Sequence, residues 1–248
     1  MISMFILKLN RIAKSLLSLN RREEYKYLVK MLSITHKDIV LDIGSGDGYW
    51  SANIAKNCNT TIGLEPDYQM MEYAINLHSK KNLSYFLGTS ENIPFADKVF
   101  DKIISISCLE HFEDPKHAIN EMYRVLKPKG TLAVSVDSLL PENSSLEFRK
   151  WHSKRHFANH YFNESELCSV LMDTGFKVES KTTKHLIKTP IGSYLRQTFI
   201  RHPRLLLPLF PIFYLGIRIL DLLFDTRHGQ IIVINATRKK SFWKSSKN

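Results

Sequence analysis

The sequence of 248 residues contains few cysteines and does not arrange them in pairs. Cys58, Cys108 and Cys168 are odd in number and widely separated. This pattern lacks the disulfide framework of small secreted domains, so it favours a reduced, cytoplasmic setting. The sequence also lacks internal repeats, and with 44% apolar residues it is long enough for one well-packed domain with appendages.

Acidic residues are absent from residues 1–22 and scarce in residues 196–248. The first of these ends carries five basic residues, and the second carries ten basic residues against two acidic ones. The ends thus contribute +5 and +8 to a formal net charge of +11, which leaves the intervening residues close to neutral. We therefore expect a negatively charged partner to contact the two ends rather than the central part of the chain.

The first 20 residues lack the uninterrupted apolar core of a signal peptide. Their apolar residues recur at helical spacing, but Lys8, Arg11 and Lys14 lie between them, and no small-residue cleavage site follows. The pattern predicts a basic amphipathic helix. Such a helix can contact a membrane surface or cap a ligand site, and the sequence leaves both alternatives open.

A strongly apolar stretch, residues 205–224, lies in an insertion before the last predicted strand, but prolines and charges interrupt it. A membrane-spanning helix needs about 20 largely uncharged residues, and a single span would put the last strand on the wrong side of the membrane. An interfacial helical hairpin therefore fits better, and a lid or a dimer helix covered by protein is the alternative. The interrupting residues are Pro208, Pro211, Arg218 and Asp221, and the residues expected to face lipid phosphate are Arg196, Arg201 and Arg204.

Residues 40–48 read VLDIGSGDG and place a short apolar strand directly before a glycine-rich turn. Glycines let the backbone turn sharply and approach a ligand, because a side chain would clash or forbid a positive φ. Glu65 ends the next apolar run, where an acid can accept both hydroxyls of a ribose. The third glycine comes one residue too early for the GxGxxG of dinucleotide-binding dehydrogenases, and Asp47 would repel a pyrophosphate. The pattern therefore predicts a nucleoside cradle that tolerates a positively charged group.

Strand-like runs alternate with helical stretches along most of the chain. The helical stretches at residues 49–57, 68–79 and 115–126 separate apolar runs, which is typical of a parallel sheet covered by helices. Ligands bind such sheets at the carboxyl ends of the strands. Three further motifs lie next to predicted strands. GTSENIPF at residues 88–95 follows the third strand, CLEHF at residues 108–112 ends the fourth, and LKPKG at residues 126–130 precedes the fifth.

In this order and spacing, the motifs of residues 38–178 resemble the class I S-adenosylmethionine-dependent methyltransferases, in the small-molecule branch that includes quinone and sterol methyltransferases. The resemblance implies an α/β fold with a Rossmann-like, seven-stranded, mostly parallel sheet and helices on both faces. It also implies S-adenosylmethionine as the cofactor. The residues that it places at the cofactor are Asp42, Gly44, Ser45, Gly46, Gly48, Glu65, Pro66, Thr89, Ser90, Glu91 and Ser107.

The resemblance gives several of these residues a role. Asp42 and the first glycines would hold the methionine portion, Glu65 the ribose hydroxyls, and Ser90 and Glu91 would lie beside the adenine. Thr89 departs from relatives, which commonly carry an aspartate there to accept from the adenine amino group. A neutral threonine hydroxyl can still accept this hydrogen bond but should bind less strongly.

Glu110 and His111 are the catalytic candidates, because they follow the fourth strand near the expected methyl group. The cofactor's sulfonium already activates the methyl group, so placing the acceptor suffices and a base is optional. Histidine, with an unperturbed pKa of about 6.5, can accept a proton from a hydroxyl, or His111 can simply contact the cofactor. Related quinone O-methyltransferases carry a glutamate three residues earlier that helps bind a metal. Ser107 stands there, so we expect no metal.

Residues 141–160 form a long segment between the fifth and sixth strands, with a mixture of aromatic, basic and histidine residues suited to a lid over a polar head group. His152, His156 and His160 follow each other at helical metal-ligand spacing. No carboxylate or cysteine completes a recognisable motif, so a zinc site is less favoured than a face that is solvated or turned to the substrate.

The expected organisation has five parts. Capping helices occupy residues 1–35, the Rossmann-like core residues 36–186, an apolar basic insertion residues 187–228, the final core strand residues 229–238, and a basic tail residues 239–248.

The leading hypothesis is a cytoplasmic methyltransferase, peripheral on the inner face of a membrane, which it contacts through residues 1–20 and 196–227. Its substrate would be an amphiphilic small molecule such as a lipid, a quinone precursor or a lipid-linked sugar. The alternatives are an RNA methyltransferase, whose binding would fall steeply with salt, and a catalytically silent cofactor-binding subunit. The sequence leaves the acceptor atom open among oxygen, nitrogen and carbon.

Overall fold

The computed structural model describes residues 13, 17–179, 183–224 and 228–239. Most of the amphipathic helix expected in the first 20 residues, and nearly all of the expected basic tail, lie outside the described residues.

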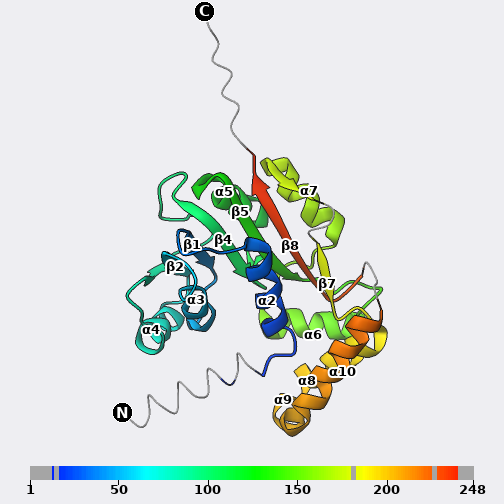
Figure 1. Cartoon of the computed structure of the whole chain (residues 1–248). Coiled ribbons are helices and arrows are strands. Elements are labelled where there is room, and N and C mark those ends of the chain that lie inside the picture. Colours follow the sequence, from blue (N-terminus) through cyan, green and yellow to red (C-terminus); the bar gives the residue numbers. More distant parts are fainter. Residues whose placement is uncertain (1–12, 14–16, 180–182, 225–227, 240–248) are drawn as a thin grey trace, which may run out of the picture.

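One mixed sheet forms the centre of the fold, with the strand order β3-β2-β1-β4-β5-β8-β6 and with β7 beside β8 (Figure 1). Strands β1 to β5 run parallel to one another, whereas β8 runs antiparallel to β5, β6 and β7. The strand order reverses between β1 and β4, so their carboxyl ends border the crevice where α/β sheets bind ligands. The strands are β1 (Ile39–Ile43), β2 (Thr60–Glu65), β3 (Leu83–Leu87), β4 (Phe100–Ile106), β5 (Leu126–Asp137), β6 (Phe176–Val178), β7 (Lys184–Leu186) and β8 (Ile231–Arg238).

The predicted sixth strand, residues 177–183, differs in the structure: β6 ends at Val178, and a further strand, β7, begins at Lys184 beyond the predicted range. Val178 of β6 pairs with Ala236, and Leu186 of β7 pairs with Ile231 farther along β8. Two short strands therefore share one position in the sheet. The predicted seven positions are confirmed, but eight strands fill them.

The central strands are buried on both faces because helices cover the sheet on each side. On one face, Ile119 and Leu167 belong to a core formed with α5 and α7, and on the other face Leu28 and Phe199 belong to a core formed with α2 and α8. The helices are α2 (Arg21–Leu32), α3 (Tyr49–Ile54), α4 (Tyr68–Leu77), the 3-10 turn η1 (Leu109–His111), α5 (Pro115–Val125), α6 (Leu146–His156), α7 (Glu164–Thr174), α8 (Pro190–Arg201), α9 (Pro203–Leu206), the 3-10 turn η2 (Leu207–Leu209) and α10 (Phe210–Leu223).

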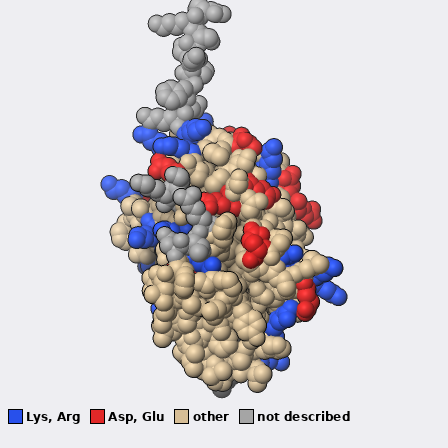
Figure 2. All heavy atoms as spheres, turned by 90° about the vertical axis from the view of Figure 1, so that its right-hand side faces the viewer, with Lys and Arg blue, Asp and Glu red and all other residues tan. Residues whose placement is uncertain are grey.

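Helices α8 to α10 project from one end of the sheet as a helical hairpin, residues 190–224, which we call the apolar hairpin (Figure 1). Its outer side exposes large apolar side chains, and Figure 2 shows a broad uncharged area over the lower part of this face, where the hairpin projects. On α10 the exposed apolar residues follow one another at intervals of three and four residues and form one stripe. This stripe consists of Ile212, Leu215, Ile219 and Leu222.

The two charged residues of α10 that interrupt its apolar sequence are both turned toward the protein. Arg218 Nη2 lies 3.2 Å from Glu23 Oε2. The Asp221 carboxylate accepts hydrogen bonds from the backbone N–H groups of Ile187 and Lys188, at 2.9 and 2.8 Å. The helical run Pro203–Leu223, with 21 residues, is long and apolar enough to cross a membrane by length and composition alone. A crossing would remove these internal contacts.

Candidate functional site

The glycine-rich turn between β1 and α3 has the conformation that the sequence predicts. Gly44, Gly46 and Gly48 have φ values of +72°, +55° and +81°, which residues with a side chain rarely adopt. A Cβ atom on Gly44 would lie 1.9 Å from Cys108 Sγ, whereas one on Gly46 would meet no atom within 4 Å. Gly46 therefore borders open space. That space is a cavity of about 240 Å³, lined by Arg21, Asp42, Gly44, Ser45, Gly46, Asp47, Trp50 and Ile106.

Asp42, in the last part of β1, is a buried acid at the wall of this cavity. The Ser51 hydroxyl donates a hydrogen bond to its Oδ2 at 2.5 Å. Burial raises the pKa of Asp42 to about 7; the Ser51 hydrogen bond opposes the shift and the charge of Glu65 adds to it. An ionised Asp42 is therefore costly until a positive ligand group lies beside it.

Replacing Asp42 by asparagine should remove a pH dependence of folding. A carboxyl whose pKa is raised from 3.8 to about 7 holds its proton more tightly in the folded state. Its contribution to stability is therefore complete below about pH 4 and is lost as the pH rises to about 7. Denaturant unfolding at pH 8 should find Asp42→Asn more stable than the native protein by a few kcal/mol, on the order given by such a shift. Equal pH dependence of the unfolding free energy in the native protein and in Asp42→Asn would contradict this prediction. The control Asp173→Asn, which replaces an exposed acid, should show the pH dependence of the native protein.

Glu65, at the carboxyl end of β2, is tied to the glycine turn. Its Oε2 accepts from the Gly46 backbone N–H at 2.8 Å, and its Oε1 accepts from the Asp67 N–H at 3.2 Å. Burial raises the pKa of Glu65, while these two N–H groups lower it. The carboxylate thus anchors the turn and retains acceptor capacity beside it.

The residues predicted at the adenine follow β3, at the same edge of the sheet. The Gly88 N–H donates to the Glu65 carbonyl oxygen at 3.1 Å, which brings this loop beside the end of β2. Ser90 is buried and its hydroxyl donates to Glu91 Oε2 at 2.9 Å. Thr89 pairs with Asn92, and Pro66 is exposed directly after Glu65. None of these four predicted residues is among those that line the cavity, so their place at the cofactor stays a prediction.

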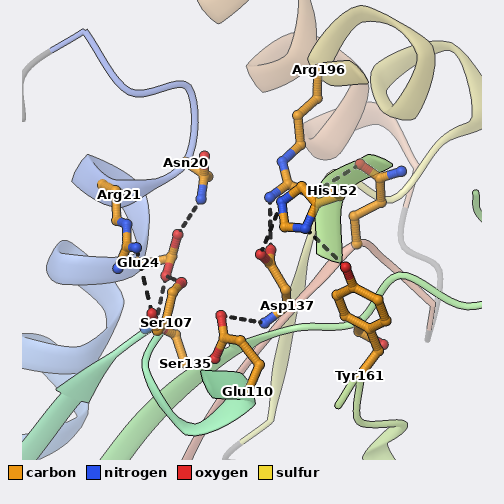
Figure 3. Close-up of polar contacts among 12 residues, drawn as sticks. Asn20, Arg21, Glu24, Ser107, Glu110, Ser135, Asp137, His152, Tyr161 and Arg196 are labelled. Carbon is orange, nitrogen blue, oxygen red and sulfur yellow. Dashed lines mark hydrogen bonds and ion pairs between the residues drawn. The ribbon is translucent and has the colours of Figure 1, made fainter. Parts of the chain in front are cut away.

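Ser107, predicted at the cofactor, contacts α2 and is not among the residues that line the cavity. Its hydroxyl donates to Glu24, and Glu24 also accepts from the Ser135 hydroxyl at 2.6 Å (Figure 3). The neighbouring Arg21 lines the cavity and donates to the carbonyl oxygens of Ile106 and Ser107. Sequence reasoning missed Arg21 and Glu24, because no local motif marks them and only packing of α2 across β4 and β5 brings them to the site.

The predicted catalytic pair diverges in space. Glu110 is fully buried, and its Oε1 accepts from the Asp137 N–H at 3.3 Å while its Oε2 has no hydrogen-bond partner. Burial, with the nearby charge of Asp137, raises the pKa of Glu110 to about 8, so the carboxyl is mostly protonated at pH 7. His111 is half-buried, and its Nδ1 lies 3.2 Å from the Phe157 carbonyl oxygen. Burial lowers the pKa of His111, so its ring is neutral at pH 7.

A buried polar cluster lies beyond Glu110, at the carboxyl end of β5 (Figure 3). Arg196 Nη2 of α8 lies 2.7 Å from Asp137 Oδ1. His152 Nε2 of α6 lies 3.6 Å from Asp137 Oδ2, and the other ring nitrogen lies 2.9 Å from the Tyr161 hydroxyl. Burial lowers the pKa of His152 to about 4, although the Asp137 carboxylate opposes this. We call these four side chains together with Glu110 the acceptor edge.

Two expectations for this region are corrected by these contacts. Arg196 was expected to face lipid phosphate, but it is buried because its charge is balanced by Asp137 inside the fold. Arg201 pairs with Glu147 at 3.1 Å and stacks over two aromatic rings of α6, and Arg204 is exposed. His152 is buried, which is contrary to a solvated face and leaves the substrate-facing alternative. Within the described ranges, no group of three or more histidine, cysteine or acidic side chains is placed to hold a metal ion.

Comparisons with known proteins agree with this geometry. The model of a methyltransferase domain matches residues 41–134. A sterol 24-C-methyltransferase of Eremothecium gossypii is 37% identical over 124 residues, which are 48% of this chain and 32% of that protein. An uncharacterised protein, MJ1123, of Methanocaldococcus jannaschii is 30% identical over 151 residues, which are 60% of this chain and 68% of that protein.

The fold has relatives among solved structures. The crystal structure of the YcgJ protein from Bacillus subtilis superposes with a TM-score of 0.63 at 19% identity, covering 89% of this chain and all of that one. In sequence, the chain spans between about a third and a half of the length of the first curated relatives that it matches.

Proposed function

We propose that this chain, which belongs to the class I S-adenosylmethionine-dependent methyltransferases, transfers a methyl group to an amphiphilic small molecule at the surface of a membrane. The protein would be cytoplasmic and peripheral on the inner face of that membrane. The observation that carries the proposal is the combination of the glycine-lined cavity with an exposed apolar hairpin whose helix α8 reaches the same edge of the sheet.

The residues around the cavity fit S-adenosylmethionine. Gly46 borders open space that a side chain would fill, and the Ser45 hydroxyl is buried without a hydrogen-bond partner. Asp42 and Asp47 suit the positive groups of the methionine portion, and Arg21 suits its carboxylate. Glu65 would accept from the ribose hydroxyls. When bound, the cofactor supplies a methyl group that its sulfonium already activates.

The work left to the protein is to place the acceptor and to accept a proton where one is released. His111 is neutral at pH 7 and half-buried, so its ring can take a proton from an acceptor hydroxyl. Glu110 carries a buried oxygen without a partner, and as a neutral carboxyl it can donate a hydrogen bond to an acceptor oxygen. We propose these roles for the two predicted catalytic residues.

The apolar hairpin supports contact with lipid rather than with water. Monomeric proteins rarely expose large continuous apolar areas, and the stripe on α10 contains no charge because Arg218 and Asp221 face inward. The expected basic ends of the chain would add attraction to anionic lipid. The similarity to a sterol methyltransferase agrees with a lipid-like acceptor.

The test is methyl transfer to lipid. The protein would be purified from separate soluble and membrane fractions and incubated with methyl-labelled S-adenosylmethionine and a total lipid extract of its source cells. Label in the organic phase, lost in Glu65→Ala, is the expected result. Cofactor binding without organic-phase label would overturn the proposal. It would then direct the search to water-soluble acceptors and RNA, and label in no phase would favour a silent cofactor-binding subunit.

A further inference from the structure

We infer that Arg196 is a positioning residue for the methyl acceptor: from helix α8 of the apolar hairpin it fixes Asp137, around which Glu110 and His152 are arranged. The inference rests on the proposed function. It makes the hairpin a part of the catalytic unit as well as a surface for lipid.

Arg196 crosses from the hairpin to the sheet and is almost completely enclosed. Its exposed fraction is 2%, and its guanidinium contacts Asp137 Oδ1 at 2.7 Å and Gln230 Oε1 at 3.2 Å. Figure 3 shows the side chain reaching from α8 toward Asp137, with His152 beside the contact. Asp137 is the last residue of β5, so the ion pair lies at the carboxyl end of a parallel strand, where ligands bind in this class of sheet.

Asp137 organises the groups of the acceptor edge through separate atoms. Its backbone N–H donates to Glu110 Oε1 at 3.3 Å, and its Oδ2 lies 3.6 Å from His152 Nε2. The second oxygen of Glu110 has no partner, although the side chain is fully buried. Buried polar atoms in folded proteins are nearly always paired. The unpaired oxygen of Glu110 therefore leaves a hydrogen-bonding position open to a ligand group at this end of the sheet.

The charge of Arg196 also controls the ionisable groups at this edge. Its guanidinium lowers the pKa of Asp137 and that of His152. His152 faces Asp137, Arg196, His156 and His111, and among these only the Asp137 carboxylate raises its pKa. In a variant without Arg196, the Asp137 carboxylate still favours a protonated His152, but the positive charge of the guanidinium no longer disfavours it. The pKa of His152 should therefore rise.

The experiment compares Arg196→Gln, Arg196→Lys and the double variant Asp137→Asn with Arg196→Gln. Turnover is measured with labelled S-adenosylmethionine and lipid extract in detergent micelles, cofactor affinity by calorimetry, and the titration of His152 by NMR of its ring. Arg238→Gln is the matched control, because Arg238 is a half-buried arginine that binds backbone carbonyls of Tyr123 and Arg124 at the opposite edge of the sheet.

Arg196→Gln should lower kcat/KM about 100-fold, which is the scale of losses from small misplacement of catalytic groups. Cofactor affinity should stay within about twofold, and the pKa of His152 should rise. Arg196→Lys, which keeps the charge, should retain the low pKa of His152 and part of the turnover. The double variant should recover stability, because removing both partners of a buried ion pair leaves no lone charge, but it should not recover turnover.

Two outcomes would overturn the inference. The first is a double variant that recovers both stability and turnover. The second is an Arg196→Gln variant whose His152 titration is unchanged and whose turnover falls no further than that of Arg238→Gln. Either result would make the ion pair purely structural. The NMR measurement needs no methyl acceptor, so it decides the role of Arg196 even if the native protein methylates no lipid, a result that would contradict the proposed function alone. In that case, a His152 pKa that rises in Arg196→Gln but stays low in Arg196→Lys supports the inference, and an unchanged titration in Arg196→Gln overturns it.

Discussion

Glu65→Ala should weaken the binding of S-adenosylmethionine by about 100-fold, as measured by calorimetry. The carboxylate makes two hydrogen bonds to backbone N–H groups, one of them to Gly46 in the glycine turn. A hydrogen bond to a charged group contributes about 1.5–3 kcal/mol, and the ribose hydroxyls would use the same carboxylate. Loss of about 3 kcal/mol corresponds to a change of roughly 100-fold in the dissociation constant.

Two further variants separate the causes. Glu65→Gln keeps the shape and one acceptor oxygen, so its affinity should fall between those of the native protein and the alanine variant. Glu72→Ala removes an exposed acid of α4 and should leave the affinity unchanged. Native affinity in Glu65→Ala would show that the carboxylate serves the folding of the turn alone.

Replacing the stripe of the apolar hairpin by serine should abolish binding to lipid vesicles. The variant changes Ile212, Leu215, Ile219 and Leu222, which are all exposed. Burying one such side chain contributes about 1.5–3 kcal/mol, so four of them contribute at least about 6 kcal/mol, or more than 1,000-fold in the partition between vesicle and water. Cosedimentation with vesicles of phosphatidylcholine and phosphatidylglycerol measures this loss.

The control for the stripe removes exposed apolar residues elsewhere. Ile75→Ser with Met172→Ser changes α4 and α7, far from the hairpin, and should bind vesicles as the native protein does. Light scattering of the native protein and of the stripe variant tests whether a second copy of the chain, rather than lipid, covers the stripe. A native dimer that the stripe variant converts to a monomer, with vesicle binding unchanged, would make the stripe an interface between two copies of the chain.

The glycine turn and its contact with Glu65 could be predicted from the sequence because they depend on residues that are local in the chain. The glycines lie within five positions of one turn, and Glu65 ends the neighbouring strand, so the period of the strands and the chemistry of the turn are enough to bring them together. The strand order and the helices on both faces follow from the same alternation.

The acceptor edge was much harder to predict because it depends on long-range packing. Arg196 and Asp137 are 59 positions apart, and a guanidinium in an apolar, basic segment suggests a lipid contact until its buried partner is known. Arg218 and Asp221 likewise count against a membrane-spanning helix in the sequence, yet both are used inside the protein. No periodicity distinguishes a charge that faces inward from one that faces solvent.

The pairing of Leu186 with Ile231 places both ends of the segment between them on adjacent antiparallel strands. Residues directly opposite each other in such strands are about 5 Å apart, a distance that a two-residue turn can bridge. The register of β7 with β8 therefore sets no particular length for residues 187–230. A chimaera with a short turn in their place would keep the glycine turn and Glu65 but leave Asp137 without its counter-ion. On the proposed function, exchanging this segment between members of the family should change acceptor preference and leave cofactor binding unchanged.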